Sequence, residues 1–162
     1  MKFIPPEKLR EIFEYDPVNG VLRWRVKRGS IKAGDIAGCS HSEGYVVIRL
    51  DGDLYFAHRL TYALCHGFIT SEVIDQVNGC RNDNRIENLR LVSATTNQQN
   101  LRKPLSNNKI GLLGVTRTPK GRFKAQITAP GRPIHIGHYD SPEEAHEAYL
   151  AVKRQVHQGC TI

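Results

Sequence analysis

The sequence has no apolar run that approaches the ~20 residues needed for a membrane-spanning helix. Its first residues, MKFIPPEKLREIF, also lack the apolar stretch and small-residue cleavage site of a secretory signal. We therefore expect a cytoplasmic protein without a membrane partner. The 162 residues allow one ordinary domain or two small ones, which excludes a large multidomain enzyme.

Cysteine is sparse, and no two cysteines form a C-x-x-C pair. This spacing gives no support for a zinc ribbon or a dithiol redox motif, so we expect no zinc. Without an export signal, reduced thiols are the expected state. The cysteines are Cys39, Cys65, Cys80 and Cys160.

Acidic residues are absent from two long windows, residues 17–34 and 104–139. The whole chain has 23 Lys and Arg against 16 Asp and Glu, a formal net charge of +7. Such an excess favours a polyanionic partner, most often nucleic acid. We expect both windows to face phosphates; the alternative is that they are solvated loops. Their cations are Arg23, Arg25, Lys27, Arg28, Lys32, Lys109, Arg117, Lys120, Arg122, Lys124 and Arg132.

Residues 1–54 read as a small β-rich basic unit. Pro5-Pro6 predicts a short helix, and strict alternation with Leu22, Trp24 and Val26 on one face predicts a strand over 21–27. Asp51-Gly52 predicts a hairpin turn. Two strands, 44–50 and 54–57, would flank this turn, with a helix over 58–68.

Residues 55–103 form the next expected unit. It begins with a predicted strand over 73–77, which a polar loop connects to a second strand over 89–92. A helix capped by Ser93 follows and runs to Lys103.

Residues 104–112 are expected to be a linker to a C-terminal domain of residues 113–162. Three strands are predicted there, over 114–117, 122–128 and 133–139. Ser141, Pro142 and Glu144 predict the start of a helix. Its apolar stripe suits packing against a three-stranded antiparallel sheet. The expected fold class is thus α+β.

The central segment contains a series of motifs in a fixed order: Ala57-His58-Arg59-Leu60, Asp75-Gln76-Val77-Asn78-Gly79, Asn82-x-Asn84-Arg85-x-x-Asn88-Leu89, and Asn97 with Asn100. On these motifs the segment resembles the HNH endonucleases, which have the ββα-metal fold. The likeness is greatest to the phage and intron-encoded homing type, and it covers residues 1–103. It implies DNA cleavage by metal-assisted hydrolysis in a bacterial or phage-infected cell.

Asp75 and Asn97 are the expected metal ligands. A carboxylate and an amide oxygen are hard ligands that suit a single Mg²⁺ or Mn²⁺ ion. The resemblance implies that this ion stabilises charge on the phosphate. It also implies that Asn88 holds the loop so that the general base is oriented.

Gln76 departs from the family, which carries its general base, a histidine, at this position. A glutamine amide can orient a water molecule but cannot accept its proton near neutral pH. Three interpretations remain open: an engineered inactive variant, which we favour because the rest of the motif is intact, a natural degenerate binding protein, or replacement of the base by His58.

Four motifs of the C-terminal segment follow one pattern: Gly114-Val115, Gly121-Arg122-Phe123-Lys124-Ala125-Gln126-Ile127, Ile136-Gly137-His138-Tyr139-Asp140, and Glu143-Glu144-Ala145-x-x-Ala148-Tyr149. On these motifs, residues 109–157 resemble an AP2 DNA-binding domain. The second predicted strand places Phe123, Ala125 and Ile127 toward the helix and cations with Gln126 outward. Such a face can contact phosphates and base edges. The expected DNA contacts of the chain are Arg23, Arg25, Lys27, Arg28, Arg59, Arg85, Arg117, Lys120, Arg122, Lys124, Gln126, Arg132 and His135.

We therefore expect a homing-type endonuclease that binds double-stranded DNA as a monomer, with Gln76 making this chain inactive. The alternative is a non-catalytic DNA-binding or regulatory protein that retains an HNH shell. An RNA-binding protein is a weaker alternative, because the strands show no solvent-facing aromatic pair for base stacking.

Overall fold

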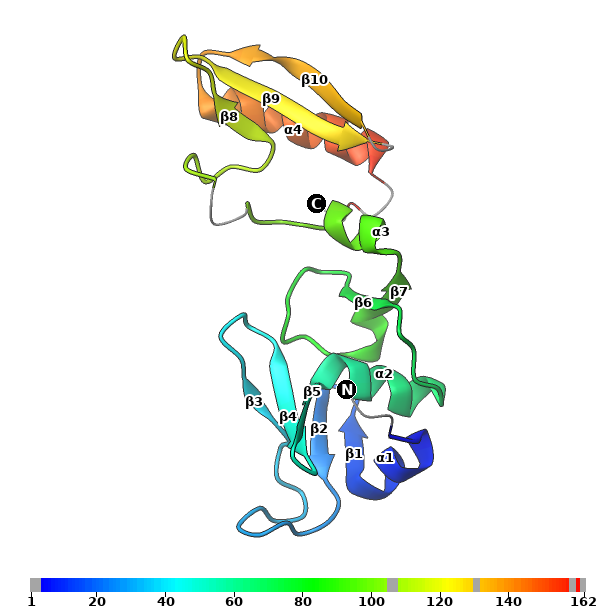
Figure 1. The fold of residues 1–162 in the computed structure, drawn as a ribbon. Coiled ribbons are helices and arrows are strands. Elements are labelled where there is room, and N and C mark those ends of the chain that lie inside the picture. Colours follow the sequence, from blue (N-terminus) through cyan, green and yellow to red (C-terminus); the bar gives the residue numbers. More distant parts are fainter. Residues whose placement is uncertain (1–3, 105–107, 130–131, 158–159, 161–162) are drawn as a thin grey trace. The chain divides into compact units, whose positions relative to one another are not determined.

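The computed structural model describes residues 4–104, 108–129, 132–157 and 160. The chain divides between Val92 and Ser93 into two compact units, each with its own sheets and helices (Figure 1). This confirms the α+β class. The predicted linker falls partly outside the described residues, which exclude 105–107. None of the helices in the described ranges is both long and apolar enough to cross a membrane.

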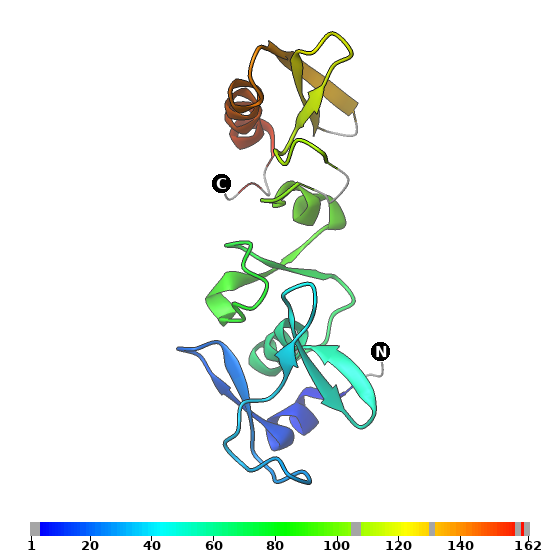
Figure 2. The same cartoon turned by 90° about the vertical axis from the view of Figure 1, so that its left-hand side faces the viewer.

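The first unit contains three small antiparallel sheets and two α-helices (Figure 2). Strands β1 and β2 pair, β4 lies between β3 and β5, and β6 pairs with β7. The elements are α1 Pro6–Ile12, β1 Phe13–Asp16, β2 Val21–Trp24, β3 Cys39–Ser40, β4 Val46–Leu50, β5 Asp53–Phe56, α2 Ala57–His66, β6 Val73–Gln76, the 3-10 helix η1 Ile86–Asn88, and β7 Leu89–Val92.

One apolar core holds the two helices and the first two sheets together. Phe13 and Trp24 face each other across β1 and β2, with ring centroids 4.8 Å apart. Leu9 of α1 and Ile48 of β4 are fully buried in the same core. Burial of such side chains stabilises a fold by about 1.5–3 kcal/mol each, so this core fixes the hairpin of β1 and β2 against the rest of the unit.

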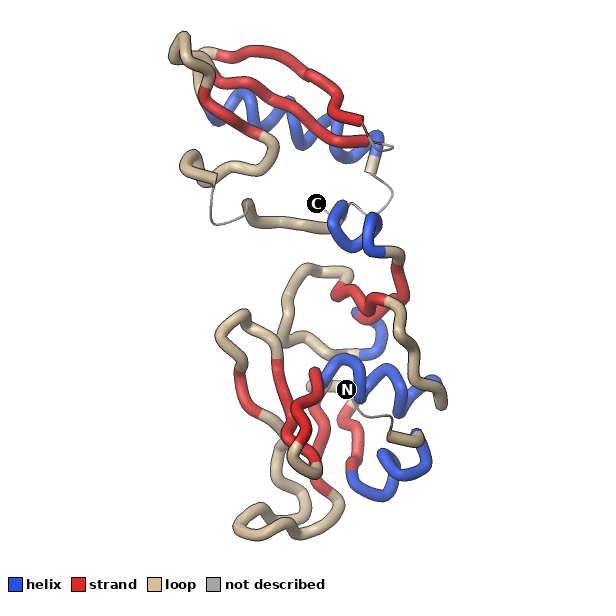
Figure 3. The backbone as a smooth tube through the Cα atoms, viewed as in Figure 1, coloured by secondary structure: helices blue, strands red, loops and turns tan. Residues whose placement is uncertain are grey.

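The predicted hairpin at Asp51-Gly52 is confirmed. Both residues have positive φ, 50° and 90°, as a two-residue turn of type I′ requires. The predicted strand over 21–27 ends early, at Trp24, and Val26 is 45% exposed. The N–H of Arg25 still donates to Ile12, but Ile12 is the last residue of α1, so β1 offers no pairing partner beyond Phe13. On its other side the backbone of Trp24 bonds to Asp35 and Gly34. Figure 3 shows most of the segment between β2 and β3 as loop.

The second unit begins with a short helix and ends with a helix that covers one face of a three-stranded sheet (Figure 1). The sheet order is β10-β9-β8, with all neighbours antiparallel. Ala125 and Ile127 of the central strand pack on Ala145 and Tyr149. The elements are α3 Ala94–Gln99, β8 Val115–Arg117, β9 Phe123–Ala129, β10 Arg132–Tyr139 and α4 Pro142–Val156.

Both helices of this unit begin where the sequence predicts. The hydroxyl of Ser93 accepts the N–H of Thr96 at 3.1 Å, and that of Ser141 accepts the N–H of Glu144 at 3.2 Å. Helix α3 ends at Gln99 rather than Lys103. Gly114 has a φ of +73°, and a Cβ there would lie 2.0 Å from the Tyr149 ring, so only glycine fits between β8 and α4.

Lys153 of α4 is buried in the second unit, with only 1% of the residue exposed, which is unusual for a lysine. Its ammonium donates to the backbone oxygen of Leu101 at 2.6 Å and lies 5.9 Å from the centre of the Tyr149 ring. Burial lowers the pKa of Lys153. The residues that follow α3 are therefore attached to α4.

Candidate functional site

Asp75 and Gln76 lie next to each other at the end of β6, and each is 5% exposed. Asp75 is opposite Arg90 of β7 in the register of the sheet. Oδ2 of Asp75 accepts hydrogen bonds from Nε and Nη2 of Arg90 at 3.0 and 2.8 Å. The guanidinium of Arg90 thus orients the buried carboxylate with two hydrogen bonds.

The Gln76 side chain donates from Nε2 to the backbone oxygen of Arg81 at 3.4 Å, a long hydrogen bond. The backbone oxygen of Gln76 accepts the N–H of Gly79 at 2.8 Å, which closes the turn after β6. Gln76 therefore lies where the chain leaves β6 for the polar loop of residues 77–85.

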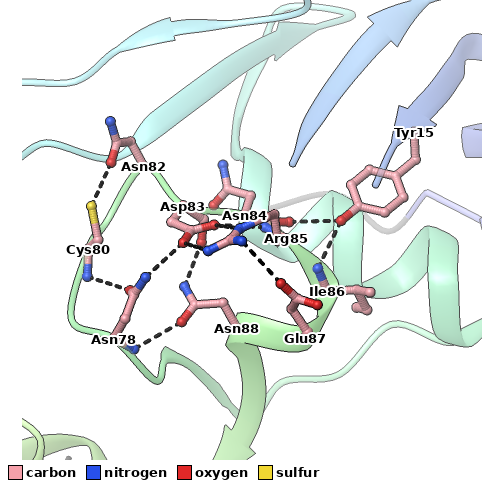
Figure 4. A network of polar contacts seen from close by, with 10 residues as sticks. All are labelled: Tyr15, Asn78, Cys80, Asn82, Asp83, Asn84, Arg85, Ile86, Glu87 and Asn88. Carbon is pink, nitrogen blue, oxygen red and sulfur yellow. Dashed lines mark hydrogen bonds and ion pairs between the residues drawn. The ribbon is translucent and has the colours of Figure 1, made fainter. Parts of the chain in front are cut away.

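Asn88 connects the two ends of this loop (Figure 4). Its Oδ1 accepts the backbone N–H of Asn78 at 2.9 Å, and its Nδ2 donates to the backbone oxygen of Asp83 at 2.9 Å. The backbone oxygen of Asn88 accepts the N–H of Val77 at 2.9 Å. Because Asn88 is only 6% exposed, these bonds are shielded from water.

The carboxylate of Asp83 accepts several hydrogen bonds within the same loop. It accepts bonds from Nε and Nη2 of Arg85 at 2.9 and 2.7 Å and from Nδ2 of Asn78 at 2.7 Å (Figure 4). The hydrogen bonds of Arg85 lower the pKa of Asp83 to about 2, and the Asp83 carboxylate in turn raises the pKa of Arg85. Arg85 also contacts Glu87 at 3.1 Å. Its guanidinium is thus engaged within the loop, and its expected contact with DNA stays a prediction.

We expect Asp83→Asn to lower the free energy of unfolding by about 1–2 kcal/mol at pH 7, since charge-assisted bonds are lost. A carboxylate whose pKa is lowered on folding stabilises the fold above its ordinary pKa of about 4. That contribution falls as the pH drops toward 2, so the difference between the two proteins should shrink at pH 3. Urea unfolding at both pH values measures it.

Asp51→Asn is the matched control, because Asp51 pairs with Arg28 at 2.7 Å but is 63% exposed. Its loss should change stability by less than about 0.5 kcal/mol. An equal effect of both variants, or one that grows at pH 3, would contradict the proposed role of Asp83 in the loop.

His58 lies at the start of α2 and is 8% exposed. Its ring stacks on Phe56 with centroids 5.5 Å apart and lies 5.4 Å from Tyr45. Burial, with a smaller effect of Arg59, lowers the pKa of His58 to about 4. Within the described part of the chain, Nδ1 of His58 has no hydrogen-bond partner. His58 is therefore neutral at physiological pH but enclosed among rings.

Among the residues that the structure describes, no group of three or more His, Cys, Asp and Glu side chains could hold a metal ion. The donor chemistry of Asp75 nevertheless fits a hard divalent ion, because a carboxylate oxygen is a preferred ligand of Mg²⁺. Asn97 is a residue of α3 in the second unit. Its pairing with Asp75 at one ion stays a prediction.

Several cations of the 17–34 window contact their own unit. Arg23 lies 3.6 Å from Asp16 and donates to the oxygen of Gly34, and Arg25 donates from Nε to the oxygen of Phe13 at 3.1 Å. Arg28 pairs with Asp51 and lies over the Trp24 ring at 5.1 Å. Lys27 is exposed. These contacts hold Arg23, Arg25 and Arg28 against their own unit. The expected contact of these cations with DNA stays a prediction.

Arg59 holds the segment that leads into β6. Nη1 donates to the backbone oxygen of Glu72 at 3.0 Å, and Nη2 donates to that of Thr70. Its expected phosphate contact stays a prediction.

The sheet of the second unit exposes the face that is not covered by α4. Lys124 lies between Thr116 and His138 in the register, and Gln126 lies opposite His135. The rings of His135 and His138 are 4.7 Å apart. Arg117, Lys120 and Arg132 are also exposed. In the register, however, Arg117 lies opposite Phe123 and Arg132 lies opposite Ala129, which alternate with Lys124 and Gln126 along β9. The register therefore places Arg117 and Arg132 on the other side of the sheet from Lys124.

Arg122 lies at the edge of this surface and is already engaged. Its Nε donates to Asp140 at 2.9 Å, and its Nη2 donates to the oxygen of His138 at 3.1 Å. DNA would have to compete with Asp140 for this guanidinium.

Sequence reasoning missed Arg90, Asp83 and Tyr15. Arg90 could have been found, because alternation in two paired strands places it opposite Asp75. Asp83 stands in the recognised Asn-rich loop, but nothing in the motif distinguishes it. Tyr15 bonds to residues 69 and 71 positions away, and no local pattern indicates such a contact.

Residues 55–99 match the family model described as HNH endonuclease. This segment is an HNH endonuclease domain, and it contains Asp75, Gln76, Asn88 and Asn97. No curated protein and no solved structure matches the chain.

Proposed function

We propose that the chain is a homing-type DNA-binding protein with a metal-dependent nuclease centre, which Gln76 makes inactive. The observation that carries the proposal is the HNH endonuclease match over residues 55–99. Family membership of this segment implies phosphodiester hydrolysis on DNA, and HNH endonucleases typically use a divalent metal.

The geometry of the first unit supports the placement of the centre at the end of β6. Asp75 is buried and hydrogen-bonded to Arg90, and Gln76 follows it in the chain. Asn88 holds the backbone at residues 77 and 78, directly after the position of the base. A bound Mg²⁺ or Mn²⁺, held by Asp75 and Asn97, would supply positive charge to the scissile phosphate.

The C-terminal sheet would act as an AP2-like DNA-binding module, supported by its three antiparallel strands and single packed helix. Its exposed face combines Lys124, Gln126 and His135, which can donate hydrogen bonds to phosphates or base edges. The basic residues 23–28 would provide a second contact with the DNA backbone. The domain boundaries 1–54, 55–103, 104–112 and 113–162 belong to this proposal.

A non-catalytic DNA-binding protein is the second candidate, and Gln76 is the observation that favours it. The amide bonds to the backbone of Arg81, so it has a structural role that does not require catalysis. Both candidates bind DNA, and they differ in what a histidine at position 76 would restore.

The direct test is a binding assay with labelled double-stranded DNA that contains the cognate site, with single-stranded RNA as competitor. We expect retention of the DNA complex when RNA is in excess. Equal competition by RNA would favour an RNA-binding protein and would contradict the proposal.

We expect Lys124→Gln to weaken DNA binding and to reduce its salt dependence. A protein that contacts about six phosphates should show a log–log salt slope of roughly −5, and loss of one phosphate contact should change this slope by about 1. Lys8→Gln removes one charge from the exposed side of α1 and is the matched control. If both variants shift the slope equally, the sheet face is not the DNA-binding surface.

A further inference from the structure

The hairpin of β1 and β2 lies outside the matched segment but contacts the polar loop of the nuclease domain (Figure 4). The hydroxyl of Tyr15 accepts the backbone N–H of Ile86 at 2.8 Å and donates to the backbone oxygen of Asn84 at 3.3 Å. One side chain thus satisfies two backbone groups, one on each side of Arg85.

The turn of the same hairpin makes a second contact. Gly20 has a φ of +66°, and a Cβ there would lie 2.6 Å from the backbone nitrogen of Arg85. The close approach holds this part of the loop against the hairpin. Since Phe13 and Trp24 of the hairpin are in the main core, the hairpin is a rigid support for it.

The supported segment leads directly to Asn88. The backbone N–H of Asn88 donates to the oxygen of Arg85 at 2.9 Å, and the Asn88 side chain bonds to both Asp83 and Asn78. The oxygen of Asn88 accepts the N–H of Val77, the residue after Gln76. A continuous series of bonds therefore runs from Tyr15 to the position of the general base.

Tyr15 has the protonation state that this arrangement needs. Burial is the main cause that raises its pKa, so the hydroxyl keeps its proton at neutral and mildly alkaline pH and can donate to Asn84. Asn84 is itself 3% exposed, so its backbone has little access to water as a substitute partner.

We infer that Tyr15 is a positioning residue of the nuclease centre, which acts through Ile86 and Asn88 on residues 76–78. The inference rests on the proposed function. If Tyr15 has this role, the N-terminal unit positions residues of the nuclease centre in addition to providing a basic surface.

The test is Tyr15→Phe, which removes only the hydroxyl. In the Gln76→His protein, we expect the single-turnover cleavage rate at saturating DNA to fall about tenfold, the value of one hydrogen bond. The dissociation constant for DNA should stay unchanged. Tyr45→Phe makes the same chemical change in the same unit and should alter neither quantity.

A second measurement does not depend on cleavage. In the chain with Gln76, Tyr15→Phe should speed hydrogen exchange at the Ile86 amide about tenfold relative to the Ile48 amide in the core. Unchanged exchange at Ile86 would overturn the inference, whatever the cleavage assay shows. The inference would also be overturned if Tyr15→Phe left the cleavage rate of an active Gln76→His protein unchanged. The same holds if unfolding or weaker DNA binding fully explained the loss of cleavage.

The two hypotheses fail in different ways. If Gln76→His is inert but exchange at Ile86 rises, the proposed nuclease function fails, whereas the support of the loop by Tyr15 stands.

Discussion

Gln76→His should raise DNA cleavage by about 10²–10⁴-fold, the usual contribution of a general base. The amide can hold a water molecule, but it cannot take the proton that the attacking water must lose. The imidazole of histidine has a reach similar to that of the glutamine side chain, and it supplies only the missing function, which is to accept this proton. Cleavage of cognate DNA with Mg²⁺ or Mn²⁺, measured for both proteins in single-turnover conditions, gives the ratio.

The restored activity should depend on pH in a defined direction. A base must be neutral to accept a proton, so cleavage should rise with pH through about 6–7 as the introduced imidazole loses its proton. The dissociation constant for DNA should change little, because glutamine is neutral and does not repel phosphate. Gln155→His on the exposed side of α4 is the control, because it adds an imidazole at a position without a role in DNA binding or proton transfer.

An inert Gln76→His protein that still binds its DNA would reject the first candidate function. The chain would then be a DNA-binding protein that has kept a nuclease fold.

Asp75→Ala should reduce metal-dependent cleavage by about 10³-fold in the Gln76→His background, which corresponds to roughly 4 kcal/mol. Asp75 is the one carboxylate among the proposed ligands, and a neutral amide alone holds a hard dication poorly against its hydration. Mn²⁺ affinity, measured by titration calorimetry with the DNA present, should fall in parallel.

Loss of Asp75 also leaves Arg90 without its carboxylate partner, so stability must be measured with activity. Glu11→Ala removes an exposed carboxylate of the same unit and should leave cleavage unchanged. Full cleavage by a folded Asp75→Ala protein would remove Asp75 from the metal site.

Local chemistry made much of the fold predictable. Asp51-Gly52 set a hairpin because only a few residues tolerate positive φ, and Ser141 with Pro142 set a helix start. The prediction that the strand extends past Trp24 to Val26 was wrong. Alternation indicates which face a side chain is on, but it does not indicate where the strand runs out of a pairing partner. The absence of acidic residues from a sequence window likewise does not show that its cations are unpaired. Arg28 and Arg122 form ion pairs with Asp51 and Asp140, which lie outside the two windows.

The elements that carry the candidate site residues were predictable where the motif is local. Asp75, Gln76 and Asn88 fall within one strand, one loop and one short helix, so their spacing carries the information. Tyr15 and Gly20 contribute through tertiary contact, which depends on the packing of the hairpin and has no trace in the sequence around the loop.

Lys153 has a practical consequence for dissecting the chain. A separately expressed C-terminal fragment that starts at residue 113 would lack Leu101, whose backbone oxygen accepts the buried ammonium. An ammonium without this acceptor is costly to bury, so such a fragment would expose α4 or lose the proton of Lys153. A fragment that starts at Ser93 keeps both the acceptor and the cap of α3, and is the better choice for isolating this half of the protein.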